Sequence, residues 1–166
     1  MCIRDRAITV TSTSTVRAVA FRTEWIPSST ETRTYFFTAD ILTQSESPSG
    51  WPASTAVNGQ AFSYGMDPNI VNANPAAVTN SLTSIPSLSV VTDQSNLVDP
   101  TIGIYVNADR SGREWERPAS IELIDPTGAE TGFDINGGLR IRGGGSRRDA
   151  NPKHSLRLYF LSLIHI

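Results

Sequence analysis

Apolar and polar residues alternate with a period of two through much of the second half of the chain, and this pattern constrains the fold most strongly. Residues 117–124 place Ala119, Ile121 and Leu123 on one face, and residues 155–160 alternate in the same way. Successive side chains of a strand point to opposite faces of a sheet, so the pattern predicts half-buried antiparallel strands. Apolar and β-branched runs predict further strands at residues 88–92, 133–135 and 139–142, and a short strand or extended segment at residues 102–106.

The first half of the chain combines strands with a region of small and polar residues. Residues 7–37 have the alternating, β-branched composition of two or three strands. Residues 40–65 are dominated by Ser, Pro, Gly, Thr and Gln but keep Trp51 and Phe62 as aromatic anchors, which indicates an ordered linker or a long loop. Asp67-Pro68 and Asn74-Pro75 each place a capping side chain before a proline and predict helix starts, the second opening a helix over residues 76–84. We therefore expect a mainly β chain of the α+β class.

The charge balance narrows the classes of function. The 166 residues include 14 basic and 16 acidic side chains, which gives a formal net charge of −2. Nucleic-acid binders and polybasic membrane binders need a large positive surplus, so neither kind of partner is expected. No apolar run approaches the roughly 20 residues of a transmembrane helix, so no membrane span is expected. Lys153 is the only lysine, which makes it a candidate for a specific role.

The two ends of the chain are related in an unusual way. Back-translation of residues 161–166 gives a codon string whose reverse complement, read one frame over, encodes the first five residues. The ends of a natural gene have no reason to be reverse complements, and the pattern resembles a translated transposase adapter from a sequencing library. We therefore expect residues 1–6 and 161–166 to be an artefact, together with Cys2 and His165. Without Cys2 the chain has neither a disulfide framework nor a cysteine zinc site.

The densest cluster of glycine and basic residues follows the predicted strand at 139–142. Consecutive glycines allow backbone N–H groups to approach an anion closely, and neighbouring Arg and Lys side chains supply positive charge. Phosphate fits this chemistry, whereas composition alone leaves open a hairpin with a solvated tip. The candidate binding residues are Gly143, Gly144, Gly145, Ser146, Arg147 and Lys153.

Other titratable residues are weaker candidates. Glu114 and Glu116 have the residue types of an acid pair for hydrolysis, but a charged loop anchored by Trp115 explains the pattern better. His154 has no partner visible in the sequence and is interpreted as the start of a strand. Three scattered aspartates in turns do not make a calcium site. They are Asp93, Asp99 and Asp125.

Several successive motifs resemble the N-terminal part of the CotH family, the spore-coat-type atypical protein kinases of bacterial surface proteins. The resemblance lies in residues 85–93, 103–107, 112–119 and 140–160. Upstream, residues 8–37 are similar to the last strands of the immunoglobulin-like module at the C-terminus of chitobiases. The expected organisation is adapter at 1–6, Ig-like strands at 7–38, a linker with short helices at 39–84, a CotH-like part at 85–160 and adapter at 161–166.

The resemblance implies a kinase-like N-lobe that binds ATP with Mg²⁺ in the intact protein and transfers phosphate to protein hydroxyls. Gly143 to Ser146 would cover the phosphates, Lys153 would contact them, and Arg147 would assist or pair with a carboxylate. Neither the G-x-G-x-x-G loop nor the V-A-I-K strand of ordinary protein kinases is present.

In such enzymes the catalytic and metal-binding aspartates come from a C-lobe, here beyond Phe160. No catalytic residue is therefore expected in this chain, which alone should be inactive. The resemblance also implies a bacterial extracellular or cell-surface location. The alternative function is a non-catalytic, β-rich surface or adhesion module of a large exported protein.

Overall fold

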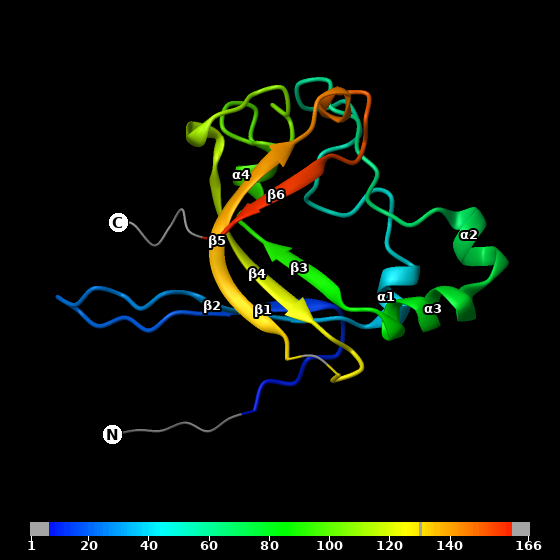
Figure 1. The fold of residues 1–166 in the computed structure, drawn as a ribbon, viewed down its shortest axis with the longest axis horizontal. Coiled ribbons are helices and arrows are strands. Elements are labelled where there is room, and N and C mark those ends of the chain that lie inside the picture. Colours follow the sequence, from blue (N-terminus) through cyan, green and yellow to red (C-terminus); the bar gives the residue numbers. More distant parts are fainter. Residues whose placement is uncertain (1–6, 130, 161–166) are drawn as a thin grey trace.

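The computed structural model describes residues 7–129 and 131–160. The predictions made for residues 1–6 and 161–166, including Cys2 and His165, lie outside these described residues. Within them the chain is mainly β, with one antiparallel sheet of four strands, one of two strands and several short helices (Figure 1). The expected mainly β, α+β class is confirmed at this level.

The larger sheet is an antiparallel meander in which neighbours in sequence are neighbours in space. Its order is β3 (Ser87–Val91), β4 (Arg117–Ile124), β5 (Phe133–Arg142) and β6 (Ser155–Tyr159). The alternating pattern of residues 117–124 became the central strand β4, and Ile121 on it is fully buried. The predicted turn at residues 125–128 connects β4 to β5, with Asp125 accepting a hydrogen bond from the backbone N–H of Thr127.

One prediction about this sheet was wrong. The sequence suggested two strands separated by Gly137 and Gly138, whereas β5 runs unbroken through both glycines. Their lack of a side chain is a packing requirement: a Cβ on Gly137 would lie 2.9 Å from Ile121 Cδ1, and one on Gly138 would collide with the Glu116 side chain. The glycines thus permit close approach inside a strand instead of ending it.

The smaller sheet is a hairpin of β1 (Ser14–Ala18) and β2 (Glu31–Tyr35), whose far end extends beyond the four-stranded sheet (Figure 1). β2 contacts the larger sheet through polar side chains. Thr32 is buried and donates a hydrogen bond of 2.8 Å to Ser120 Oγ. The backbone N–H of Thr34 donates to Glu122, and Arg33 forms an ion pair with Asp134. Hydroxyl and carboxylate groups therefore hold the hairpin on the sheet.

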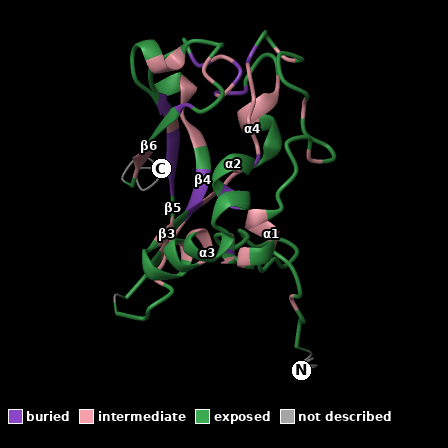
Figure 2. Ribbon diagram, turned by 90° about the vertical axis from the view of Figure 1, so that its right-hand side faces the viewer, coloured by how far each residue is buried: buried purple, intermediate pink, exposed green. Residues whose placement is uncertain are grey.

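Three short helices lie in the connection between β2 and β3, and a fourth follows β3 (Figure 1). Two of them begin where capping was predicted: α2 (Pro68–Ala73) after Asp67 and α3 (Pro75–Ser84) after Asn74, whose side chain accepts a hydrogen bond from Ala77 N. The sequence did not predict α1 (Thr38–Leu42) or α4 (Gln94–Val98). Figure 2 shows that α2 and α3 are largely exposed and that burial concentrates in β4, β5 and the segments above them. No helix in the described part of the chain is long and apolar enough to cross a bilayer.

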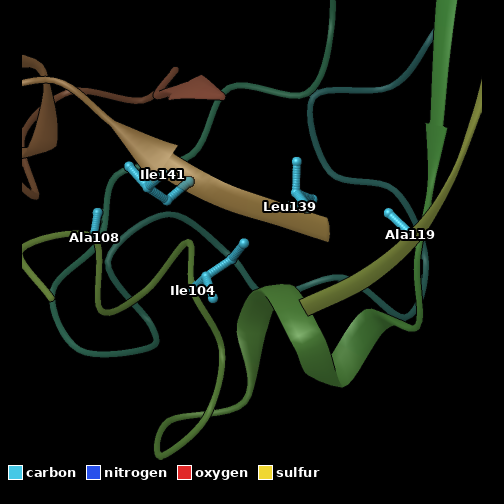
Figure 3. Close-up of a cluster of buried hydrophobic side chains, with 5 residues drawn as sticks. All are labelled: Ile104, Ala108, Ala119, Leu139 and Ile141. Carbon is cyan, nitrogen blue, oxygen red and sulfur yellow. The ribbon is translucent and has the colours of Figure 1, made fainter. Parts of the chain in front are cut away.

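The hydrophobic core lies between the sheet and the connection from β3 to β4. Its buried side chains are Ile104, Ala108, Ala119, Leu139 and Ile141 (Figure 3). The short strand or extended segment predicted at residues 102–106 is wrong, because these residues form a series of turns. Its N–H groups bond to α4 and the turns around it: Ile104 N donates to Asn96 O, and Tyr105 N donates to Leu97 O. Ile104 is nevertheless buried, at 2% exposure. The apolar residues of this segment therefore indicated that it is buried, but not which backbone conformation it adopts.

An irregular segment, residues 51–65, crosses from the β3–β4 connection to the β5–β6 connection, and we call it the strap. Asn58 Nδ2 donates to Pro100 O at 2.9 Å and to Asn107 Oδ1 at 3.0 Å. On the other side, Ala61 N donates to Asp149 O at 2.7 Å. Phe62 stacks against Tyr105, with 5.9 Å between ring centroids. The strap is therefore packed and hydrogen-bonded, as expected of an ordered linker with aromatic anchors.

Candidate functional site

A cleft of about 480 Å³ lies where the β5–β6 connection meets the turns after α4. Five of its lining residues are arginines, and none of the described residues that line it is acidic. The glycine loop contributes Gly143 and Gly144 to its wall, and Trp115 and Tyr159 contribute aromatic surface. The lining arginines are Arg110, Arg140, Arg142, Arg147 and Arg157.

The strand register brings two of these arginines together. Arg140 on β5 lies opposite Arg157 on β6, and like charges in such a position repel. Glu116 relieves the repulsion, because its carboxylate accepts a hydrogen bond from Arg140 Nε at 2.8 Å and forms an ion pair with Nη2 at 2.5 Å. The ring of Tyr159 lies 4.2 Å from the Arg140 guanidinium carbon and 5.8 Å from that of Arg157. The positive charge of Arg140 is thus balanced by Glu116, and the orientation of its guanidinium is fixed.

Three other arginines of the cleft lack, in the described part of the chain, the kind of carboxylate partner that Arg140 has. Within the described residues, no carboxylate forms an ion pair with Arg142, Arg147 or Arg157. Arg142 and Arg157 are exposed to solvent. Several guanidinium groups around one concave surface raise the local positive potential and favour an anionic ligand.

Arg147 is held by backbone carbonyls. One Nη donates to Arg110 O at 2.9 Å and the other to Ile141 O at 2.7 Å. Its Nε is buried and has no hydrogen-bond partner among the described residues. These bonds fix the guanidinium across the base of the loop without cancelling its charge.

The glycine loop continues from β5 into a single 3₁₀ turn, η2 (Gly145–Arg147). Gly143 has a φ of +125°, and a Cβ there would collide with Ser146 Oγ, so this position requires glycine. A Cβ on Gly144 or Gly145 would meet nothing within 4 Å, so the space beside both residues is open. The loop therefore presents accessible backbone at the edge of the cleft.

The structure brings together only part of the predicted set. Gly143, Gly144 and Arg147 line the cleft, whereas Gly145, Ser146 and Lys153 are not among its lining residues. Lys153 Nζ instead lies 3.5 Å from the backbone carbonyl of Gly65, at the end of the strap.

Sequence reasoning missed the four other arginines. Arg140 and Arg142 alternate with the buried Leu139 and Ile141, which was a signal that both point away from the core. Arg110 gave no such signal, because a turn rather than a strand precedes it.

The weaker candidates have structural roles. Glu116 is occupied by Arg140, so its carboxylate is not free for hydrolysis. Asp99 accepts hydrogen bonds from the backbone N–H groups of Ile102 and Thr101. These bonds, the one from Ile102 most of all, hold the pKa of Asp99 below its ordinary range. Across residues 7–129 and 131–160, no group of three or more His, Cys, Asp or Glu side chains is placed to hold a metal ion.

No protein-family model, curated protein or solved structure matches the chain. The fold and the site together define a class in physical terms: a mainly β chain with an arginine-lined cleft bounded by a glycine loop.

Proposed function

We propose that the chain forms the nucleotide-binding β lobe of a CotH-like atypical protein kinase, and that the cleft binds the phosphates of ATP. The observation that carries this proposal is a group of cleft arginines that have no carboxylate partner among residues 7–129 and 131–160 and that lie beside Gly143 and Gly144. These arginines are Arg142, Arg147 and Arg157. Guanidinium groups are well matched to phosphate oxygens, because their planar N–H groups donate in pairs. The family resemblance supplies the nucleotide; the cleft supplies only the preference for an anion.

The residues present suit the phosphate end of ATP. Open backbone at Gly144 allows phosphate oxygens to approach the main chain. Mg²⁺, when bound with ATP, neutralises phosphate charge. The resemblance assigns its protein ligands and the catalytic aspartates to a C-lobe outside the described residues. The role proposed for this chain is therefore to bind and orient phosphates, in a parent protein on a bacterial surface whose substrates are protein hydroxyls.

The test is a ligand series measured by calorimetry at fixed ionic strength. Adenosine, AMP, ADP, ATP and inorganic tripolyphosphate are titrated into the purified chain. We expect affinity to increase with the number of phosphates and to fall with added salt, because charge-assisted contacts dominate the binding. Adenosine binding as tightly as ATP, or no binding of any phosphate ligand, would contradict the proposal.

One feature favours the alternative of a non-catalytic surface or adhesion module. The far end of the β1–β2 hairpin exposes large apolar side chains: Phe21 is 84% exposed, Trp25 67% and Ile26 96%. Large exposed apolar groups that gather in one place commonly mark interaction surfaces. Cosedimentation with purified peptidoglycan tests this reading. A triple Ser variant at the three positions should lose cosedimentation and keep ATP binding, whereas equal cosedimentation of both proteins would count against adhesion through the hairpin.

A further inference from the structure

A buried polar connection joins the strap to the glycine loop. Gln60 in the strap is completely buried, and its Nε2 donates to Ala61 O at 2.6 Å and to Asn151 O at 2.9 Å. These two acceptors identify the amide nitrogen and leave Oε1 facing His154 Nε2 at 2.8 Å. The other ring nitrogen of His154, Nδ1, lies 2.7 Å from Ser146 O in the glycine loop. A continuous series of polar contacts at hydrogen-bond distance thus runs from the strap to the loop.

Further hydrogen bonds nearby also connect the strap, the glycine loop and the start of β6. Ala61 N donates to Asp149 O at 2.7 Å, and Asn151 Nδ2 donates to Gly145 O at 2.9 Å. His154 N donates to the Tyr105 hydroxyl, which in turn donates to Pro152 O at 2.8 Å. A buried polar group left without its partner costs about 1–3 kcal/mol, so these groups have a strong preference for the observed arrangement.

The glycine loop depends on such support, because it packs poorly by itself. Gly144 and Gly145 have open space where a side chain would be, and glycine is the residue with the greatest backbone freedom in the unfolded chain. The arginine that η2 carries, Arg147, faces the cleft only while η2 keeps its position. Contacts from outside the loop must therefore define its shape.

We propose that Gln60 and His154 are positioning residues for the anion cleft: through Ser146 they hold the glycine loop in the conformation that aims Gly144 and Arg147 at the ligand. This inference rests on the proposed function, and it assigns the region that resembled a linker a role in ligand binding. Neither residue lines the cleft, so each acts through the loop.

The test compares Gln60→Leu and His154→Asn with a matched control, Thr32→Val. Thr32 is also buried but lies on β2, and Thr32→Val removes one side-chain hydrogen bond, to Ser120. Gln60→Leu removes the two bonds that Nε2 donates and the contact of Oε1 with His154. The first measurement is hydrogen exchange of the unliganded protein at the amides of Arg147 and Arg148, which bond to carbonyls of the loop. The second is the dissociation constant for inorganic tripolyphosphate.

We expect Gln60→Leu to accelerate exchange at both loop amides at least tenfold more than Thr32→Val does, and to raise the dissociation constant about tenfold. His154→Asn keeps an N–H donor near the position of Nδ1, so it should fall between Gln60→Leu and wild type. It also carries the test if Gln60→Leu fails to fold. Equal exchange and equal affinity in Gln60→Leu and Thr32→Val would overturn the inference. If wild type binds no tripolyphosphate, the proposed function fails, and the exchange experiment alone decides whether Gln60 and His154 position the loop.

Discussion

The ion pair between Glu116 and Arg140 allows the most detailed prediction. Both side chains are largely buried, at 10% and 21% exposure, and the carboxylate accepts a charge-assisted hydrogen bond from Arg140 Nε and forms an ion pair with Nη2. Glu116→Gln removes the negative charge and leaves the Arg140 guanidinium opposite Arg157. Breaking a buried pair by removing one partner costs about 3–5 kcal/mol. Because glutamine keeps one acceptor oxygen and Arg140 retains some solvent contact, we expect a loss of about 2 kcal/mol.

Urea denaturation of wild type, Glu116→Gln, Arg140→Met and the double variant measures this loss as a double-mutant cycle. The coupling energy should be about 1–3 kcal/mol, since the two residues contact each other directly. Glu116→Gln should also bind tripolyphosphate more tightly than wild type, because the cleft gains a guanidinium without a carboxylate partner. A stability change below about 0.5 kcal/mol together with unchanged affinity would refute the assigned role of Glu116.

Four further predictions concern the core, the sheet and two titrating groups. Ile104→Ala should cost about 2–5 kcal/mol in urea denaturation, because Ile104 is buried in the hydrophobic cluster. Gly138→Ala should destabilise the chain and also reduce the coupling between Glu116 and Arg140, because the added methyl group would displace the Glu116 side chain. The pKa of Asp99 is lowered in the folded chain, so its contribution to stability is present above the usual Asp pKa and is lost as the pH falls through the folded value. Asp99→Asn should therefore flatten the acid limb of a plot of stability against pH. Burial raises the pKa of Tyr105, so stability linked to Tyr105 is present below the usual Tyr pKa and is lost as the pH rises through the folded value. Tyr105→Phe should therefore remove one of the late steps in an ultraviolet titration.

The sequence predicted those parts of the fold that depend on local chemistry. The alternation in residues 117–124 reports which side chains face the core, and the same residues form β4. Asn74 followed by proline caps α3 through a bond made within a single turn of chain. Both features depend only on residues that are close in the sequence, so they can be predicted from a single sequence.

The rest depends on contacts between distant residues. Gly137 and Gly138 look like a strand break until the neighbouring Ile121 and Glu116 are known to require their small size. Gln60 lies in a polar region that resembles a linker, and its partner His154 is 94 residues away. The arginines of the cleft come from two strands, a loop and a turn, so no sequence spacing marks them as a group.

If the cleft binds phosphate through its arginines, removing one exposed arginine must weaken the binding of ATP. Arg142 and Arg157 are exposed, so Arg142→Gln and Arg157→Gln should leave stability almost unchanged. Arg22→Gln, on the exposed far end of the hairpin, removes the same charge away from the cleft and serves as the matched control.

Calorimetric titration with ATP at fixed ionic strength supplies the comparison. Each cleft variant should lose about tenfold to a hundredfold in affinity, which corresponds to one charge-assisted hydrogen bond of about 1.5–3 kcal/mol. Arg22→Gln should stay within about twofold of wild type, because a distant exposed charge is screened. Equal ATP affinities in wild type, Arg142→Gln and Arg157→Gln would show that these arginines do not bind the phosphates of ATP.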